Sequence, residues 1–119
     1  MKIAVTASGP DTSSAIDQRF GRAAYLLVVD TVDGNVATVD NKAGMDASQG
    51  AGIQAAQKVI DNGADVLVSG HCGPKAFRAL SAAGVKVYLA PEGTVDQAVD
   101  AFQQGGLEEA LAADVDGHW

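Results

Sequence analysis

The chain contains few of the residues that support disulfide, redox or metal chemistry. Its 119 residues include one cysteine, two histidines and three prolines. A single cysteine excludes an intramolecular disulfide framework and fits the reducing cytoplasm. No apolar run approaches the roughly 18 residues needed to cross a bilayer, and the opening MKIAVTASG does not resemble a signal peptide. We therefore expect a cytoplasmic location and no membrane partner.

Positive charge is also scarce. Eight Lys and Arg residues stand against 15 Asp and Glu residues, and the resulting net charge of −7 argues against a nucleic-acid partner. Five of the eight basic residues nevertheless lie in or beside three glycine-containing segments: Arg19, Arg22, Lys42, Lys75 and Arg78. This clustering predicts a local positive crevice on an acidic protein. Such a crevice suits a compact multivalent anion better than a long polyanion.

Length and hydrophobic periodicity predict a single α/β domain over residues 1–119. The expected strands are 1–7, 24–30, a strand with Val36 and Val39 after the Asp-Gly turn of 31–41, 64–70 and 85–91. The expected helices are 51–63, with Ile53, Ala56, Val59 and Ile60 on its apolar face, 74–84, and 94–106, with Thr94 as N-cap. Residues 8–22 are expected to form a long loop. The tail from about residue 106 is expected to be partly helical and then frayed.

This order of elements also predicts the topology. The first strands can form an antiparallel meander, whereas the later strand–helix–strand units require parallel strands with right-handed connections. The expected result is a mixed five-stranded sheet with helices on its faces, similar in order to a ribonuclease-H-like fold. In such open sheets ligands bind outside the carboxyl ends of the parallel strands. Those ends here are TASG, VSGHCG and LAPEG.

The first candidate segment, DQRFGRA (17–23), places Arg19 and Arg22 on either side of Phe20 and Gly21. Guanidinium groups suit bound anions, and glycine permits close approach of a ligand to the backbone. The alternative is that both arginines pair with surface carboxylates, which an acidic protein has in plenty. These residues alone favour neither interpretation.

The second candidate segment, SQGAGIQAAQ (48–57), is a glycine-rich entry to a helix. Free N–H groups and the positive end of the helix dipole make such an entry a potential anion site. The alternative is that Ser48 is an N-cap and that the glycines allow close packing. The segment matches neither phosphate-binding glycine pattern, G-x-x-x-x-G-K-[ST] or G-x-G-x-x-G, so nucleotide binding is not supported.

The third candidate segment, VSGHCGPKAFR (68–78), holds the only cysteine. A helix N-terminus beside Cys72 favours its thiolate, and H-C-x5-R resembles the phosphate loop of cysteine-dependent phosphatases, with Arg78 as the clamp. Pro74, however, removes a loop N–H group, and Ala79 replaces the usual hydroxyl residue. A closed zinc site needs four ligands, and only His71 and Cys72 are nearby. The simplest alternative is that Cys72 is a small buried residue and His71 an ordinary loop histidine.

Taken in order, the motifs resemble the dinitrogenase iron–molybdenum cofactor-binding family. They are MKIAVTAS, RFGRAAYLLVVD, GAGIQAAQ and DVLVSGHCGPKAFRAL followed by GVKVYLA, and together they extend from residue 1 to about 105. The resemblance implies a ribonuclease-H-like domain that carries, stores or assembles an anionic metal–sulfur cluster. It implies no catalysis of its own. The alternatives to cluster binding are the cysteine-dependent phosphatase, with Cys72 and Arg78, and an interaction domain without a cofactor, in which the glycines are structural. Two departures are that Lys42 follows Asn41, where a proline is common, and that Gln49 precedes Gly50, where a histidine or glycine is common.

The resemblance also implies a set of cluster-binding residues. By position in the motifs, the residues that would line the cluster site are Ser8, Arg19, Phe20, Gly21, Arg22, Asn41, Lys42, Gly50, Gly52, Ser69, Gly70, His71, Cys72, Gly73 and Lys75. His71 and Cys72 are the only conventional candidates for direct metal ligation. The implied cargo is a molybdenum–copper sulfide cluster, with the iron–molybdenum cofactor or a related precursor as the alternative. Cluster donor or acceptor proteins are the implied partners.

Overall fold

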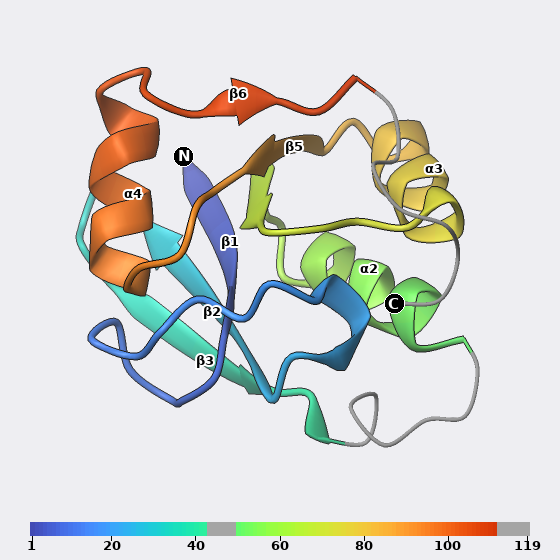
Figure 1. Cartoon of the computed structure of the whole chain (residues 1–119), viewed down its shortest axis with the longest axis horizontal. Helices are drawn as coiled ribbons and strands as arrows, with labels where there is room; N and C mark the ends of the chain where they lie inside the picture. Colours follow the sequence, from blue (N-terminus) through green and yellow to red (C-terminus); the bar gives the residue numbers. More distant parts are fainter. Residues whose placement is uncertain (43–49, 112–119) are drawn as a thin grey trace.

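The computed structural model describes residues 1–42 and 50–111 and has a mixed α/β architecture (Figure 1). Its six-stranded sheet has the order β3-β2-β1-β4-β5-β6. The strands are β1 Lys2–Ala7, β2 Tyr25–Asp30, β3 Val36–Asp40, β4 Val66–Ser69, β5 Lys86–Leu89 and β6 Glu108–Glu109. The helices are α2 Ala51–Asp61, α3 Pro74–Ala82 and α4 Val95–Gln103, and η1 Phe20–Arg22 is a turn of 3-10 helix.

The pairing of the strands divides the sheet into an antiparallel and a parallel part. β1, β2 and β3 form the predicted antiparallel meander, in which Val5 lies opposite Leu27. β1, β4 and β5 are parallel neighbours. α2 precedes β4, α3 connects β4 to β5 and α4 follows β5. Figure 1 shows α2 and α3 on one face of the sheet and α4 on the other. The carboxyl ends of the three parallel strands therefore lie at one edge of the molecule.

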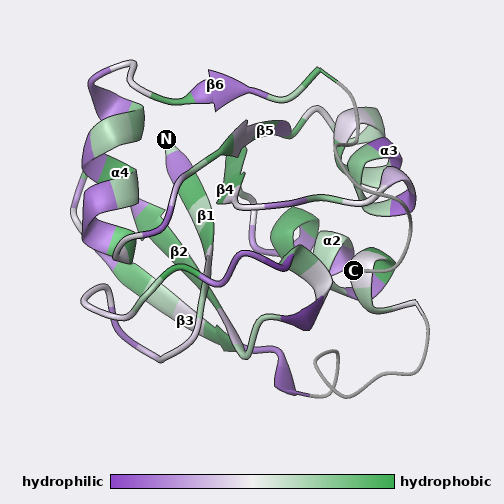
Figure 2. Ribbon diagram, in the orientation of Figure 1, coloured by the Kyte–Doolittle hydropathy of each residue, from purple (hydrophilic) through white to green (hydrophobic). Residues whose placement is uncertain are grey.

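Two apolar clusters, one on each face, hold the helices to the sheet. Leu26, Leu67 and Val87 pack with residues of α2 and α3 on one face. Val5, Leu27 and Val68 pack with Val95 and Ala98 of α4 on the other. The central strands are consequently hydrophobic throughout, whereas the exposed faces of the helices are polar (Figure 2). Such continuous apolar strands are typical of parallel sheets covered on both faces.

The structure confirms the mixed α/β class but corrects the number of strands. Glu108–Glu109 pairs antiparallel with Tyr88 and Leu89 as a sixth strand, where the sequence predicted a partly helical tail. This additional strand, β6, consists of two glutamates, a residue type that is depleted in strands, so its sequence does not predict a strand. The rest of the tail, residues 112–119, lies outside the described residues. The ribonuclease-H-like classification stays a prediction.

Individual helix predictions have mixed outcomes. Thr94 is the N-cap of α4, and its hydroxyl and the Gln97 side chain form a reciprocal capping box. In α2, by contrast, Ile53 is 48% exposed, so its predicted place on the apolar face is wrong. The buried face of α2 consists of small residues, including Ala55 and Ala56, because this helix packs closely. Ser48, the alternative N-cap of α2, lies outside the described residues.

The segment 15–20 crosses the carboxyl ends of the parallel strands. Isolated bridges join Ile16 to Ala7, Ala15 to Thr94 and Arg19 to His71. This segment was expected to be a loop, and its backbone instead bonds to the strand ends. This segment therefore lies across the strand ends at which the ligand was predicted, beside η1. No helix among the described residues is long and apolar enough to cross a membrane.

Candidate functional site

The structure brings the three candidate segments together. The backbone N–H of Phe20 donates to the carbonyl of His71 at 3.3 Å, which joins η1 to the end of β4. On its other side η1 packs against the first turn of α2. We refer to the three parts, residues 19–22, 50–52 and 70–75, as the turn site. Segments that lie far apart in the sequence thus form one continuous surface.

The turn site depends on two close approaches that leave no room for a side chain. A Cβ atom on Gly21 would lie 2.7 Å from the backbone nitrogen of Gly52. A Cβ atom on Gly70 would lie 2.6 Å from the Cα atom of Gln18. Real Cβ atoms essentially never approach other atoms so closely. Both glycines are therefore required by packing, whatever their role toward a ligand.

Gln18 is itself unusual, although no motif in the sequence pointed to it. Its Nε2 atom is buried and, within the described part of the chain, is the one buried side-chain nitrogen or oxygen atom without a hydrogen-bond partner. An unsatisfied buried donor is unfavourable, so an acceptor at this position would be stabilising. Gln18 lies directly against Gly70 and thus adds an unused N–H donor next to the turn site.

The helices that begin at the turn site lack the side-chain cap that α4 has. Gly50 and Gly73 are the N-cap residues of α2 and α3, and neither supplies a side-chain hydrogen bond. The first N–H groups of an α-helix have no partner within the helix, and the dipole makes this end positive. The starts of α2 and α3 consequently offer backbone donors and partial positive charge at the same surface.

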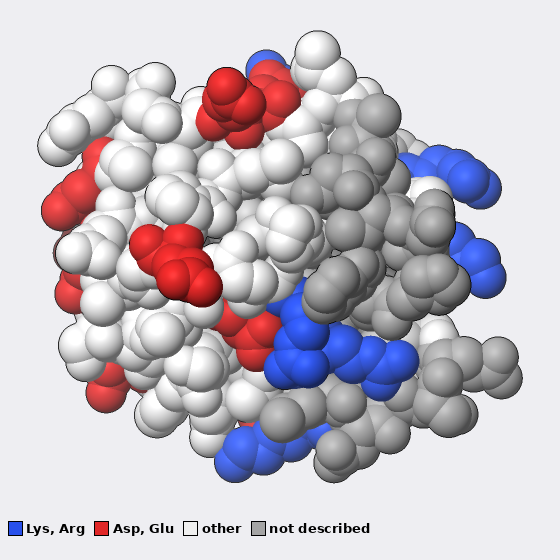
Figure 3. All heavy atoms as spheres, in the orientation of Figure 1, with Lys and Arg blue, Asp and Glu red and all other residues white. Residues whose placement is uncertain are grey.

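Basic side chains surround these backbone donors. In Figure 3 the visible Lys and Arg side chains lie mostly toward η1, α2 and α3, whereas most visible Asp and Glu side chains lie toward α4 and β6. The Arg19 side chain is 48% exposed, and its Nε lies 3.5 Å from the carboxylate of Asp17. Arg19 therefore pairs with a carboxylate, as one of the two interpretations of this segment predicted. Because its side chain is half-exposed, the guanidinium is still accessible to a ligand.

Lys42 is a second accessible cation, located immediately after β3. Its ammonium lies 5.0 Å from the centre of the Tyr25 ring. A hydrogen bond with the Tyr25 side chain raises the pKa of Lys42 above its usual value, and charge interactions with Tyr25 and Asp40 act in the same direction. Lys42 therefore keeps its positive charge at neutral pH, as the sequence analysis assumed.

Cys72 and His71 have different environments. Cys72 is only 1% exposed and belongs to the apolar cluster beneath α2 and α3. Its Sγ lies 3.8 Å from the carbonyl of Gly73, a weak contact. His71 is partly exposed, and its carbonyl accepts from Phe20. A phosphatase nucleophile must reach its substrate, so the burial of Cys72 speaks against that alternative.

Three residues with a predicted role in binding are engaged in bonds within the protein. The Ser69 hydroxyl is fully buried and lies 3.0 Å from that of Thr6, linking β4 to β1. The Ser8 hydroxyl donates to the carbonyl of Ala15 at 3.2 Å, on the side of the molecule where Ala15 bridges to Thr94. Asn41 is buried behind η1. Direct contact of these residues with a ligand stays a prediction.

Residues 1–105 match the family described as dinitrogenase iron-molybdenum cofactor. The chain belongs to this family. Its structure is similar to that of the apo form of the orange protein from Desulfovibrio gigas, with 48% identity, 96% of each chain covered and a TM-score of 0.92. It is also similar to a putative NifB protein from Thermotoga, with 38% identity, 96% of this chain and 98% of that chain covered and a TM-score of 0.82.

A more distant relative is an uncharacterised protein of Methanocaldococcus jannaschii, 26% identical over 112 residues, which are 92% of this chain and 91% of that protein. Membership of the family makes a metal–sulfur cluster the expected cargo. Within the described residues, no group of three or more His, Cys, Asp or Glu side chains is placed to hold a metal ion. The turn site instead presents backbone N–H groups and cations, which are groups that suit an anion.

Proposed function

We propose that this protein holds a preformed, anionic molybdenum–copper sulfide cluster by noncovalent contacts at the turn site and carries or helps to assemble it. The observation that carries the proposal is the convergence of η1 with the starts of α2 and α3. The cargo itself follows from the family, with the iron–molybdenum cofactor or a precursor as the alternative. A cytoplasmic location and exchange of the cluster with donor or acceptor proteins belong to the same proposal.

Physical chemistry explains how such a surface would hold the cluster. Sulfide atoms of a coordinatively saturated cluster accept hydrogen bonds, and the backbone N–H groups at the starts of α2 and α3 donate them. Arg19 and Lys42 offset the negative charge of the cluster, and the exposed guanidinium of Arg19 can donate to two acceptor atoms at once. Phe20 is buried and anchors η1 in the apolar cluster. No step requires a bond between protein and metal.

Reconstitution tests this function. The purified chain is incubated without oxygen with tetrathiomolybdate and copper(I), or with tetrathiomolybdate alone, and is then separated from free metal by gel filtration. We expect molybdenum and copper to elute with the folded protein and to give it a visible absorption band, and denatured protein to release both metals. Metal-free, colourless protein would contradict the proposal. Binding of tetrathiomolybdate alone would favour a different molybdenum cargo.

Cys72→Ala separates noncovalent binding from ligation by the thiol. Because the Cys72 side chain is buried in the apolar cluster, we expect the variant to fold with a small loss of stability, on the order of 1 kcal/mol. We expect it to bind molybdenum as tightly as the wild type. The measurements are bound molybdenum, the visible absorption band and the thermal midpoint. Complete loss of metal from a folded variant would identify Cys72 as a true ligand.

A further inference from the structure

Lys58 of α2 forms a charged link to the turn site that the sequence analysis missed. Its ammonium donates to Asn41 Oδ1 at 2.6 Å and lies 3.5 Å from the carbonyl of Asp40. The side chain is only partly exposed. The contacts of this ammonium with described residues are to neutral oxygen atoms, the amide oxygen of Asn41 and the carbonyl of Asp40. Lys58 thus brings a positive charge to the described residues beneath η1.

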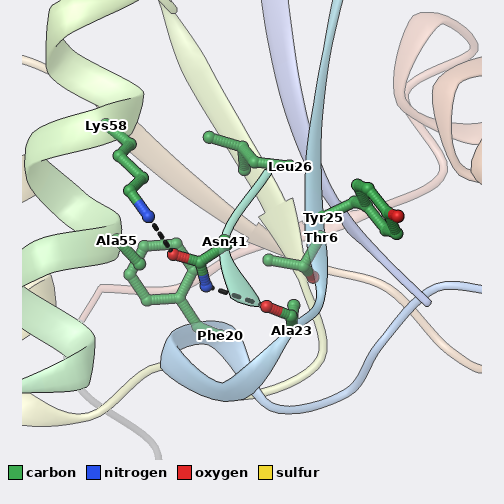
Figure 4. Close-up of a pocket in the computed structure, with 8 residues that line it drawn as sticks. All are labelled: Thr6, Phe20, Ala23, Tyr25, Leu26, Asn41, Ala55 and Lys58. Atoms are coloured by element: carbon green, nitrogen blue, oxygen red, sulfur yellow. Dashed lines mark hydrogen bonds between the residues drawn. The ribbon is translucent and has the colours of Figure 1, made fainter. Parts of the chain in front are cut away.

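Asn41 passes this link on to the turn. The residue is 2% exposed, and its Nδ2 donates to the carbonyl of Ala23 at 2.8 Å and, at 3.5 Å, to that of Gly21. Its backbone N–H donates to the carbonyl of Ala24 at 2.8 Å. Figure 4 shows Lys58 extending from α2 to Asn41, with Asn41 in turn directed at Ala23. Asn41, the first residue after β3, therefore holds the segment 21–24 through three hydrogen bonds.

The surroundings make these hydrogen bonds difficult to replace. Phe20, Leu26 and Ala55 lie around the link, and the space between the lining residues is too small to hold a water molecule. The charged ammonium of Lys58 polarises the Asn41 amide and so strengthens the hydrogen bond that this amide donates to Ala23. This effect is larger where water is excluded. Loss of the Asn41 amide would leave the carbonyl of the buried residue Ala23 without this donor.

We propose that Lys58 and Asn41 are positioning residues for anion binding, an inference that rests on the function proposed above. The Asn41 amide holds the carbonyl oxygens of Gly21 and Ala23, which would repel an anion, directed toward itself. The charge of Lys58 polarises that amide and adds positive potential behind η1. A mobile η1 would expose these carbonyls to the cargo, so the fixed turn is what makes the site selective for a compact anion.

Hydrogen exchange in the protein without cargo tests the positioning directly. In Lys58→Met the charge and the donor are lost at similar side-chain length, and in Asn41→Asp the donor to Ala23 is lost while Lys58 keeps an acceptor. We expect exchange of the hydrogen-bonded amides of Phe20 and Arg22 to accelerate by about 10-fold or more in both variants, as for loss of a hydrogen bond involving a charged group. Exchange in α4 should stay unchanged. Lys58→Arg should restore slow exchange.

Uptake of tetrathiomolybdate with copper(I) provides the functional readout. We expect affinity to fall by about 10-fold in Lys58→Met and to recover in Lys58→Arg. Lys86→Met, which removes an exposed lysine at the start of β5, is the matched control and should bind like the wild type. Unchanged exchange at the turn, or faster exchange with unchanged uptake, overturns the inference. If the wild type takes up nothing, the proposed function fails, and the exchange data still decide whether the link fixes η1.

Discussion

Gly21→Ala should weaken cluster uptake at least about 10-fold and destabilise the protein by about 1–3 kcal/mol, as overpacking of a close contact does. The added Cβ would lie 2.7 Å from the nitrogen of Gly52 and 2.9 Å from the carbonyl carbon of Ala51. Because both are backbone atoms, η1 and the start of α2 must separate. The donors of the two segments would then no longer face one cargo. Bound molybdenum and the thermal midpoint are the two measurements.

Gly84→Ala is the matched control for this variant. Gly84 follows α3 with a φ of +79°, and an added Cβ would meet no atom within 4 Å. Alanine costs roughly 1–2 kcal/mol in this left-handed conformation, so the control loses a comparable amount of stability without a change at the turn site. We expect it to retain full uptake. Equal uptake by the two variants would show that the contact between η1 and α2 does not shape the binding surface.

Arg19→Glu should reduce uptake by about 10-fold or more at low salt, since it exchanges an attractive for a repulsive charge beside the anion. The stability of the fold should change little, because the Arg19 side chain is 48% exposed and exposed ion pairs contribute about 0–1 kcal/mol. The Arg19→Glu substitution also places a second carboxylate beside that of Asp17. The measurement is titration of the cargo at increasing ionic strength. The difference in cluster affinity between Arg19→Glu and the wild type should become smaller, because salt screens exposed charges.

A second charge reversal distinguishes the effect of a charge at the turn site from the effect of the protein's net charge. Lys86→Glu makes the same change in net charge at the start of β5, at the opposite end of the parallel strands from the turn site. It should leave uptake within about twofold of wild type, because a Debye length is only about 10 Å at 0.1 M salt. Equal effects of the two reversals would mean that only the net charge of the protein matters. No effect of Arg19→Glu would contradict the electrostatic part of the proposal.

Local signals in the sequence were sufficient for most of the fold. The capping box of α4 was predictable because Thr94 and Gln97 are three residues apart, and the parallel strands because they are short apolar runs between helices. The sixth strand was not predictable, since Glu108–Glu109 acquires its conformation only by pairing with β5. The exposure of Ile53 was likewise not predictable from hydropathy, because α2 turns Ala55, Ala56 and Val59 toward the core instead.

The candidate site was predictable as a region and less so residue by residue. The rule that ligands bind at the carboxyl ends of parallel strands selected only VSGHCG among the three candidate segments. The other two segments were selected by their glycines and arginines, and the structure places all three at one edge. The sequence did not reveal that residues 15–20 cross those ends. Nor did it reveal that Ser69 faces Thr6 and that Asn41 faces Lys58. The direction of a polar side chain depends on partners distant in sequence.

The burial of Cys72 has a practical consequence. As the only thiol in the chain, it offers a single site for covalent labelling. Because it is 1% exposed within the apolar cluster beneath α2 and α3, a maleimide reagent can reach it only when the packing around it opens. The labelling rate would therefore report how often the packing around α2 and α3 opens. A cargo that bridges their first turns would slow that rate without touching the sulfur atom.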